Sequence, residues 1–214
     1  QQAEGHEASP SGPVSAPFFL RGKLVEGADV INTSRDLGVD FCTPFLQLDG
    51  VVSPRTEVPP LLNIPTSEII DFLVETGERI RDPKNDIFQE CIERMCVTHI
   101  LPREVVAVQA LQATALLDKR RLMAELEQNF PDPKALDTWV PKQDYTGRKS
   151  FVRAFAPRLI HVLPGNSPGV AVKSIAHGAL VKAVNVFKMS SSDPFTTVAI
   201  LRTMAEIDPD HPIV

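Results

Sequence analysis

The sequence predicts an α/β protein that ends in a parallel βαβα unit, and three observations support this prediction. First, residues 159–163 form a short apolar run flanked by prolines, with the length and composition of a buried strand. Second, small and apolar residues recur at helical spacing over residues 170–182, before a second short strand at 185–188. Third, a polar turn follows each strand, and a last helix is predicted from Pro194 to about Ile207, capped by Asp193 or Ser192. In such a unit with a right-handed crossover, ligands bind beyond the carboxyl ends of the strands, where both polar turns lie.

Residues 18–150 are predicted to form a β and helical lead-in to this unit. Short apolar runs separated by glycines predict strands or a hairpin over residues 18–52. Four prolines predict an extended connector over residues 53–65. Helical periodicity predicts helices over residues 66–80 and 86–97, and one long helix over residues 102–129. Residues 131–146 are predicted to be irregular, and residues 150–155 to form a connecting strand.

Composition and charge argue against several classes of protein. The 214 residues carry a formal net charge of -5, and no basic stripe with interleaved aromatics is present, so no nucleic-acid partner is expected. No stretch approaches the roughly 18 apolar residues of a membrane span. Residues 1–17 lack the basic and apolar regions of a signal peptide and are predicted to be a disordered leader. Three cysteines do not make a disulfide framework, so a cytoplasmic protein is expected.

Several candidate sites have an ordinary structural explanation. Cys91, Cys96 and His99 lie close in sequence, but at about 100° per residue the two cysteines point about 140° apart on a helix, so no metal site is predicted. Cys42 lies in a strand-like run, with no neighbouring base in sequence and no helix start to lower its pKa. His177 is expected to be packed or capped rather than catalytic. Neither a phosphate-binding G-x-x-x-x-G-K-[ST] motif nor a G-x-G-x-x-G fingerprint is present.

The two polar turns carry the remaining signal, with Asn166 in the first and Lys188 at the start of the second. Their sequences, LPGNSPG and NVFKMSSSDPFT, resemble the aldehyde dehydrogenase superfamily, which has a P-W-N-F-P-like turn and a K-P-S-x-x-[ST]-P-like turn. Within it they are most similar to the fatty acyl-CoA and acyl-thioester reductases of bacterial bioluminescence. The likeness is close over residues 158–214 and diffuse before them. Gly165, where most aldehyde dehydrogenases have Trp, favours the reductase branch. The alternative interpretation, which does not use the resemblance, is that residues 158–214 form a generic βαβ unit.

The resemblance implies a fold, an activity and partners. Residues 151–214 would be the first βαβα half of an aldehyde-dehydrogenase-like Rossmann domain that binds NAD(P). The implied activity is NADPH-dependent reduction of an acyl-CoA or other acyl thioester to an aldehyde through a cysteine thioester. The nucleophilic cysteine would lie in a downstream catalytic domain that this chain lacks, so the 214 residues are expected to be an inactive amino-terminal part of a longer enzyme. A homo-oligomer is expected, and the rest of the same chain is a further expected partner. Alternatives are a non-catalytic homologue that binds a nucleotide or a partner, and an aldehyde-oxidising dehydrogenase.

The resemblance also implies roles for individual residues. Asn166 would donate a hydrogen bond to the developing oxyanion, although an Asn also tolerates the backbone of a turn. Many NAD-preferring members carry Glu three residues after the lysine, where this chain has the neutral Ser191, which favours NADPH. Asp193 is expected to face away and cap the following helix. Lys188 resembles the family lysine that binds the adenosine ribose, although strand-end lysines are more often simply solvated. The predicted cofactor-binding residues are Leu163, Pro164, Gly165, Lys188, Ser190 and Ser191.

Overall fold

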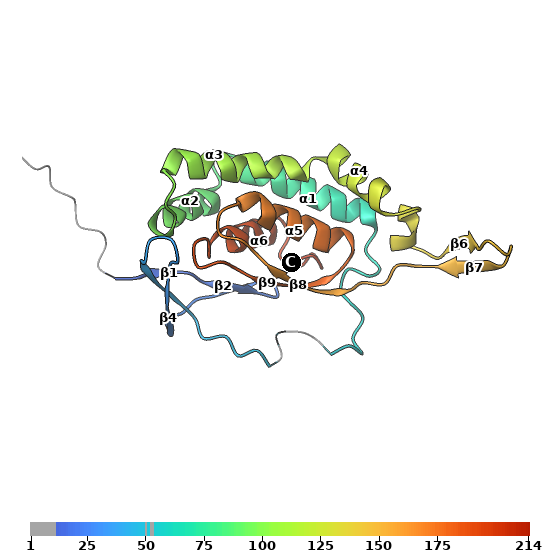
Figure 1. The fold of residues 1–214 in the computed structure, drawn as a ribbon, viewed down its shortest axis with the longest axis horizontal. Coiled ribbons are helices and arrows are strands. Elements are labelled where there is room, and N and C mark those ends of the chain that lie inside the picture. Colours follow the sequence, from blue (N-terminus) through green and yellow to red (C-terminus); the bar gives the residue numbers. More distant parts are fainter. Residues whose placement is uncertain (1–11, 50, 52–53) are drawn as a thin grey trace, which may run out of the picture.

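The computed structural model describes residues 12–49, 51 and 54–214 and has the predicted mixed α/β character. Small strands come first, a group of helices follows, and a β-hairpin leads into the final βαβα unit (Figure 1). Within the described ranges the strands form one three-stranded sheet and three two-stranded sheets. The helices lie on one side of the last two strands (Figure 1).

The amino-terminal strands confirm the prediction of short strands and a hairpin. They are β1 (Val14–Ser15), β2 (Phe18–Leu20), β3 (Lys23–Val25), β4 (Val30–Thr33) and β5 (Asp40–Thr43). The strands β2 and β3 pair antiparallel around Arg21 and Gly22, both of which have positive φ. The strand β5 pairs with β1 on one side and with β4 on the other. Residues 54–65 form a connector of turns without a strand or helix, and residues 52–53 lie outside the described part.

The predicted disordered leader extends too far along the chain. Residues 1–11 lie outside the described part, but β1 pairs in parallel with β5, and Ala16 next to it is 1% exposed. The backbone N–H of Ala16 donates to the carbonyl of Cys42 at 2.8 Å. The prediction failed because it judged residues 12–17 by their local composition, whereas a strand from elsewhere in the chain supplies their hydrogen bonds.

The helices of the lead-in confirm two predictions and correct a third. The helices α1 (Thr66–Arg81) and α2 (Asp86–Thr98) lie within about a residue of the predicted bounds. The single long helix predicted over residues 102–129 is wrong. It is instead α3 (Arg103–Ala113), a 3₁₀ turn (Thr114–Leu117) and α4 (Lys119–Asn129).

Asp118 explains the break in this helix. Its backbone is extended, and its side chain accepts a hydrogen bond from the backbone N–H of Arg121 at 3.1 Å, so it caps α4. The 3₁₀ turn before it places Leu117, which is 2% exposed, against Gly77 of α1. The apolar spacing continued through residue 118 and concealed the capping signal.

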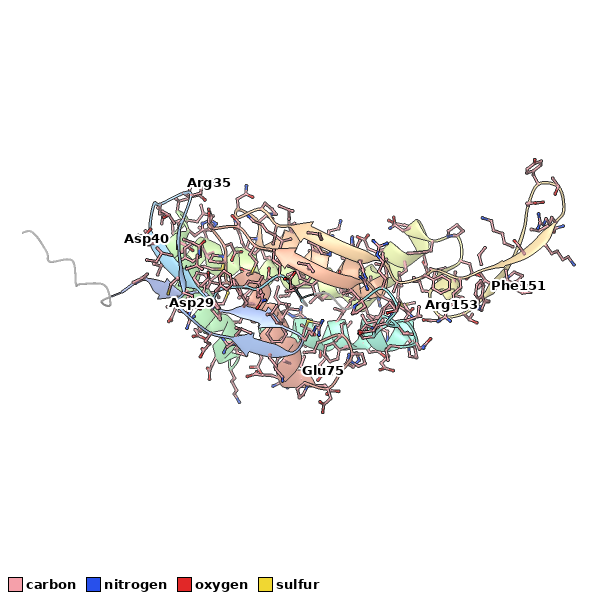
Figure 2. The ribbon with its side chains drawn as sticks, turned by 90° about the horizontal axis from the view of Figure 1, so that it is seen from below. Asp29, Arg35, Asp40, Glu75, Phe151 and Arg153 are labelled. Carbon is pink, nitrogen blue, oxygen red and sulfur yellow. The ribbon has the colours of Figure 1, made fainter. Side chains whose placement is uncertain are left out.

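A β-hairpin connects the helices to the last unit. It consists of β6 (Val140–Gln143) and β7 (Lys149–Val152), which pair antiparallel, and it follows a short 3₁₀ helix (Pro133–Leu136). Residues 131–146 are therefore less irregular than predicted. The hairpin projects from one end of the molecule, with Phe151 on it, while Arg35 lies at the opposite end (Figure 2).

The βαβα unit forms as predicted. It comprises β8 (Arg158–Val162), α5 (Pro168–Leu180), β9 (Val184–Lys188) and α6 (Thr196–Ile207). The two strands are parallel, with Arg158 opposite Val184 and Val162 opposite Lys188. Both polar turns therefore leave the sheet at the same edge.

The prediction that β8 is a buried strand is wrong for one of its faces. Ile160 is 77% and Val162 is 74% exposed, because the helices cover only the other face of the two described strands. On the covered face, α5 packs so closely that a Cβ on Gly178 would lie 2.9 Å or less from three atoms of the Asn185 side chain. One continuous hydrophobic core joins α5 and α6 to α1, α2 and α3.

An ion pair between a buried lysine and a partly exposed carboxylate joins the lead-in to the βαβα unit at the opposite end of α5 from the polar turns. Lys182, 2% exposed and with φ of 59°, donates to Asp137 at 2.6 Å and to the carbonyl of Ile64 at 2.7 Å. The same carboxylate oxygen of Asp137 accepts from the hydroxyl of Thr66 at 2.7 Å. The start of α1 and the end of α5 are thus held together by one carboxylate.

Candidate functional site

The two polar turns pack directly against each other at the carboxyl edge of β8 and β9. The backbone N–H of Leu163 donates to the carbonyl of Lys188 at 3.0 Å and extends the strand pairing into the turns. Leu163 and Gly165 are buried, whereas Pro164 and Asn166 are exposed. The structure therefore brings the predicted oxyanion donor and the predicted cofactor residues to one edge of the sheet.

Gly165 is required because there is no room for a side chain at this position, and not because of its backbone conformation. Its φ is not positive, so its backbone does not itself demand glycine. A Cβ at this position would lie 2.5 Å from the Ser190 hydroxyl and 2.7 Å from the Ser192 Cβ. The missing side chain is what allows the first turn to touch the second.

Asn166 presents a free amide. It does not have positive φ, so the turn does not depend on the tolerance of Asn for left-handed backbone. Among the hydrogen bonds of the residues that the structure describes, none involves its side chain. These two observations weaken the explanation of Asn166 as a turn former and leave its amide N–H groups available to a ligand.

The serine hydroxyls of the second turn accept hydrogen bonds, one from within the turn and one from the lead-in. The Ser190 hydroxyl accepts from the backbone N–H of Ser192 at 3.2 Å. The Ser191 hydroxyl accepts from the backbone N–H of Arg35 at 3.3 Å, across 156 positions of sequence. Because a hydroxyl that accepts can still donate, the Ser191 proton remains available. Lys188 is exposed at the end of β9.

Asp193 behaves as predicted. It is 8% exposed, and its carboxylate accepts from the backbone N–H groups of Thr196 at 3.0 Å and Phe195 at 3.3 Å, so it caps α6. Burial raises the pKa of Asp193, although these hydrogen bonds oppose the shift. The helix itself begins at Thr196, so Pro194 precedes its first turn instead of lying in it.

An ion pair from the lead-in lies beside the second turn. The Arg35 Nε and the Asp36 carboxylate are 3.1 Å apart, in the loop between β4 and β5. The Ser192 hydroxyl, followed by the Arg35 guanidinium, lowers the pKa of Asp36. This loop therefore brings one positive and one negative charge to the turn that was predicted to bind the cofactor.

The three cysteines do not have the surroundings of a nucleophile. Burial raises the pKa of Cys91 well above its ordinary value, and burial also raises the pKa of the partly exposed Cys96. Cys42 is 5% exposed, and its sulfur lies 3.7 Å from the carbonyls of Pro13 and Val14. No group of three or more His, Cys, Asp or Glu side chains in the described ranges is placed to hold a metal ion.

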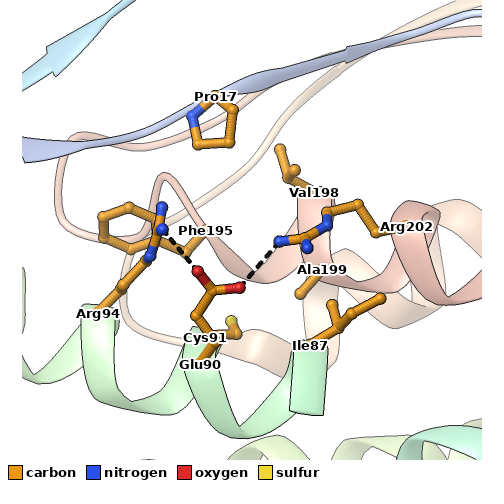
Figure 3. A pocket seen from close by; sticks show the side chains of 9 residues that line it. All are labelled: Pro17, Ile87, Glu90, Cys91, Arg94, Phe195, Val198, Ala199 and Arg202. Atoms are coloured by element: carbon orange, nitrogen blue, oxygen red, sulfur yellow. Dashed lines mark hydrogen bonds and ion pairs between the residues drawn. The ribbon is translucent and has the colours of Figure 1, made fainter. Parts of the chain in front are cut away.

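The hollow beside Cys91 is a structural feature (Figure 3). It measures about 20 Å³, which is room for about one water molecule. The Glu90 carboxylate lies between Arg94 at 2.6 Å and Arg202 at 3.1 Å (Figure 3). Arg94 also donates to the carbonyl of Ser15 at 2.8 Å. This cluster ties α2 to α6 and to β1.

A larger hollow of about 380 Å³ lies beside the first turns of α5. Its polar lining includes Ser167, Lys173, His161 and His177, but none of the predicted site residues. His177 is 3.5 Å from the Glu125 carboxylate, and partial burial lowers the pKa of its imidazole. His161 hydrogen-bonds to the Asn185 amide oxygen at 3.0 Å and stacks on Phe187.

Sequence analysis missed the residues of the lead-in that contact the two turns. They are Arg35, Asp36, Thr98 and His99. His99 was considered only as a metal ligand beside the cysteines. Its position just after the last apolar residue of a predicted helix was the one available signal, since such residues often bond at a helix end.

Two polar turns that meet at the carboxyl edge of parallel strands define the class of protein: a mixed α/β protein with a candidate ligand site at that edge. In the described part of the chain, no helix has both the length and the apolar character needed to cross a membrane.

The family model for acyl-CoA reductase (LuxC) matches residues 61–214, and the chain belongs to this family. It is 32% identical to the long-chain acyl-protein thioester reductase of Vibrio harveyi over 155 residues, which are 71% of this chain and 31% of that protein. It is 33% identical to the protein of the same name from Photorhabdus laumondii over 147 residues, 68% of this chain and 30% of that protein. The chain thus spans about a third of the length of these curated relatives. The resemblance to the bioluminescence-type reductases is confirmed.

Proposed function

We propose that the chain is the cofactor-binding, amino-terminal part of an NADPH-dependent reductase that converts an acyl-CoA or another acyl thioester to an aldehyde. The observation that carries this proposal is the contact of Gly165 with Ser190 and Ser192, which joins the Asn166 turn to the Lys188 turn. Membership of the acyl-CoA reductase family supports it, as do the printed names of the relatives, which are thioester reductases. In this proposal residues 151–214 begin a Rossmann-like domain.

The residues at this edge fit a dinucleotide. No side chain caps the start of α5: Ser167 makes no capping hydrogen bond, and Pro168 has no N–H. The backbone N–H of Gly169 and the helix dipole are therefore available to phosphate oxygens, whereas the N–H of Val170 donates to the carbonyl of Ser167 at 3.0 Å. The bare backbone of Gly165 allows close approach, and Lys188 contributes a positive charge at the strand end.

The second turn favours NADPH over NADH. Ser191 places a neutral donor where a carboxylate would repel a 2′-phosphate. Two like charges about 4 Å apart at an effective dielectric of about 20 repel by roughly 4 kcal/mol. Asp193 does not supply that carboxylate, because it is buried against the start of α6. Arg35, whose backbone N–H donates to Ser191, adds a positive charge to the loop that contacts this turn, although Asp36 offsets part of that charge.

Asn166 is the proposed oxyanion donor. NADPH, when bound, supplies the hydride that reduces the acyl carbon. When a nucleophile adds to the carbonyl carbon of the thioester, negative charge develops on the carbonyl oxygen before the carbon–sulfur bond breaks, and the free amide of Asn166 can donate to that oxygen. The nucleophilic cysteine is proposed to lie outside these residues, since burial raises the pKa of Cys91 and of Cys96, and Cys42 is 5% exposed.

Two exposed apolar surfaces support the proposed partners. The open face of β8, with Ile160 and Val162, suits further elements of the same protein. The projecting hairpin carries Tyr145 and Phe151, exposed at 101% and 67%, and it suits the expected homo-oligomer (Figure 2). A cytoplasmic location remains part of the proposal.

The direct test uses the full-length protein with a long-chain acyl-CoA and NADPH. We expect one aldehyde to form for each NADPH oxidised. NADPH oxidation without aldehyde, or no reaction with any acyl thioester, would contradict the proposed activity.

A further inference from the structure

We infer that the carboxyl end of α2 positions the Asn166 turn, with His99 as the positioning residue; this inference rests on the proposed function. Thr98 is the last residue of α2 and His99 follows it directly. Each of these consecutive residues holds one of the two polar turns. Neither would touch a substrate, and both act through the backbone that they hold.

His99 fixes the peptide bond that immediately precedes Asn166. It is 6% exposed, and its Nε2 lies 3.2 Å from the carbonyl oxygen of Gly165. The backbone N–H of Leu101 donates to its Nδ1 at 3.2 Å. Because Nδ1 accepts, it carries no proton, and the neutral ring therefore donates from Nε2 to Gly165. The carbonyl of Gly165 and the N–H of Asn166 belong to the same rigid peptide plane.

Thr98 holds the second turn in the same way. Its side chain is completely buried, and its hydroxyl donates to the carbonyl of Ser192 at 3.2 Å. Its own carbonyl accepts from the hydroxyl of Ser34 at 2.8 Å, and Ser34 is 1% exposed. The spacing between the two turns is thus set twice: by their direct contact at Gly165 and by the end of α2.

This arrangement matters for Asn166 because nothing else orients its side chain. Its amide has no hydrogen-bond partner among the described residues, so its location follows from the backbone alone. A catalytic donor that is displaced by about 1 Å loses roughly 100-fold in rate. Loss of the His99 bond should therefore lower kcat through Asn166, while the NADPH-binding turn keeps its own hydrogen bonds.

The test compares two ends of one helix in the full-length enzyme. His99→Leu replaces the imidazole ring with an apolar side chain of similar size and so removes both of its hydrogen bonds. The matched control is Asn85→Ala, because Asn85 is also 6% exposed and caps the opposite end of α2 by accepting from Phe88 at 3.1 Å. Both variants should lower the melting temperature. Only His99→Leu should lower kcat, by roughly tenfold or more, with KM for NADPH changed less than about twofold. His99→Gln, which can still donate to Gly165, should recover part of kcat.

A double-mutant cycle with Asn166→Ala decides whether His99 acts through Asn166. We expect His99→Leu to lower kcat in the wild-type background and to have almost no effect in the Asn166→Ala background. Equal losses in both backgrounds, or an equal kcat loss in Asn85→Ala, would overturn the inference and leave the proposed function intact. If Asn166→Ala alone leaves kcat unchanged, the proposed role of Asn166 fails instead. Should His99→Leu not fold, the same cycle with His99→Gln applies the same criterion.

Discussion

The two polar turns lie side by side but differ in how their polar side chains are held. Those of the second turn are engaged: the Ser190 hydroxyl accepts from within the turn, the Ser191 hydroxyl accepts from the lead-in, and the Asp193 carboxylate is buried against α6. The first turn is held by His99, and its proposed oxyanion donor, Asn166, is exposed and makes no side-chain hydrogen bond. Under the proposed function, this difference suits the second turn to recognition of the cofactor and the first turn to presenting a free donor.

The largest expected effect comes from the free donor. In the full-length enzyme, Asn166→Ala should lower kcat by roughly 100-fold or more, because it removes a hydrogen bond that is strongest in the transition state. Steady-state kinetics with saturating NADPH measures it. Asn129→Ala, an exposed Asn on α4, is the control and should leave kcat unchanged. An Asn166→Ala variant with lower thermal stability and unchanged kcat would show that the residue only forms the turn.

A smaller effect is expected from the second turn. Ser191→Glu should lower the ratio of kcat/KM for NADPH to that for NADH by tenfold or more, since a carboxylate would face the 2′-phosphate. The control, Ser150→Glu on the exposed hairpin strand β7, should not change this ratio. The prediction fails if wild-type enzyme prefers NADH or if the Ser191 variant keeps the wild-type ratio.

Separating the two turns tests their contact. Gly165→Ala should destabilise the protein by about 1–3 kcal/mol, because the new methyl group would overlap Ser190 and Ser192. Gly169→Ala is a close control: it lies four residues on, has no positive φ, and would meet atoms no closer than 3.8 Å. Chemical unfolding of both variants gives the comparison. Equal stability of the two variants would show that the turns can move apart without cost.

The ion pair at the other end of α5 should contribute stability but no catalysis. Burial tends to raise the pKa of Asp137, but the hydrogen bonds from Lys182 and Thr66 outweigh it, and the net shift lowers the pKa below 3.8. The stabilisation is therefore complete above about pH 3.8 and is lost as the pH falls through the lowered pKa.

Asp137→Ala tests this contribution. It should lower the free energy of unfolding at pH 7 by roughly 1–2 kcal/mol, a reduced value because the Asp137 side chain is 40% exposed. Asp71→Ala, which breaks the exposed pair with Lys119, should change it much less. Urea unfolding of wild type and both variants at pH 7 and pH 3 measures these free energies. An equal loss of stability in Asp137→Ala and Asp71→Ala would contradict the account.

The sequence predicted the parts of this molecule that depend on local pattern. The helices α1 and α2 and the order β8–α5–β9–α6 follow from apolar spacing. The predicted site residues lie where β8 and β9 end. The break at Asp118 was missed because apolar spacing continued through a capping residue. The exposure of Ile160 could not be foreseen, since it depends on which elements cover the sheet. The contacts of His99 and Arg35 span 66 and 156 positions and leave no periodic signal.

The smallest expected effect is none at all. After incubation of these 214 residues with an activated acyl thioester, mass spectrometry should find no stoichiometric acylation of Cys42, Cys91 or Cys96. Burial keeps the thiols of Cys91 and Cys96 protonated, because it raises their pKa values. Stoichiometric acylation of any of the three would place the nucleophile within this chain.

The proposed roles of the two turns are tested most directly by titrating NADPH into the full-length enzyme and into its variants Asn166→Ala and Ser191→Glu. We predict that the Kd of Asn166→Ala stays within about twofold of wild type, while that of Ser191→Glu rises tenfold or more. Equal shifts in both variants, or wild-type protein that does not bind NADPH, would contradict the account.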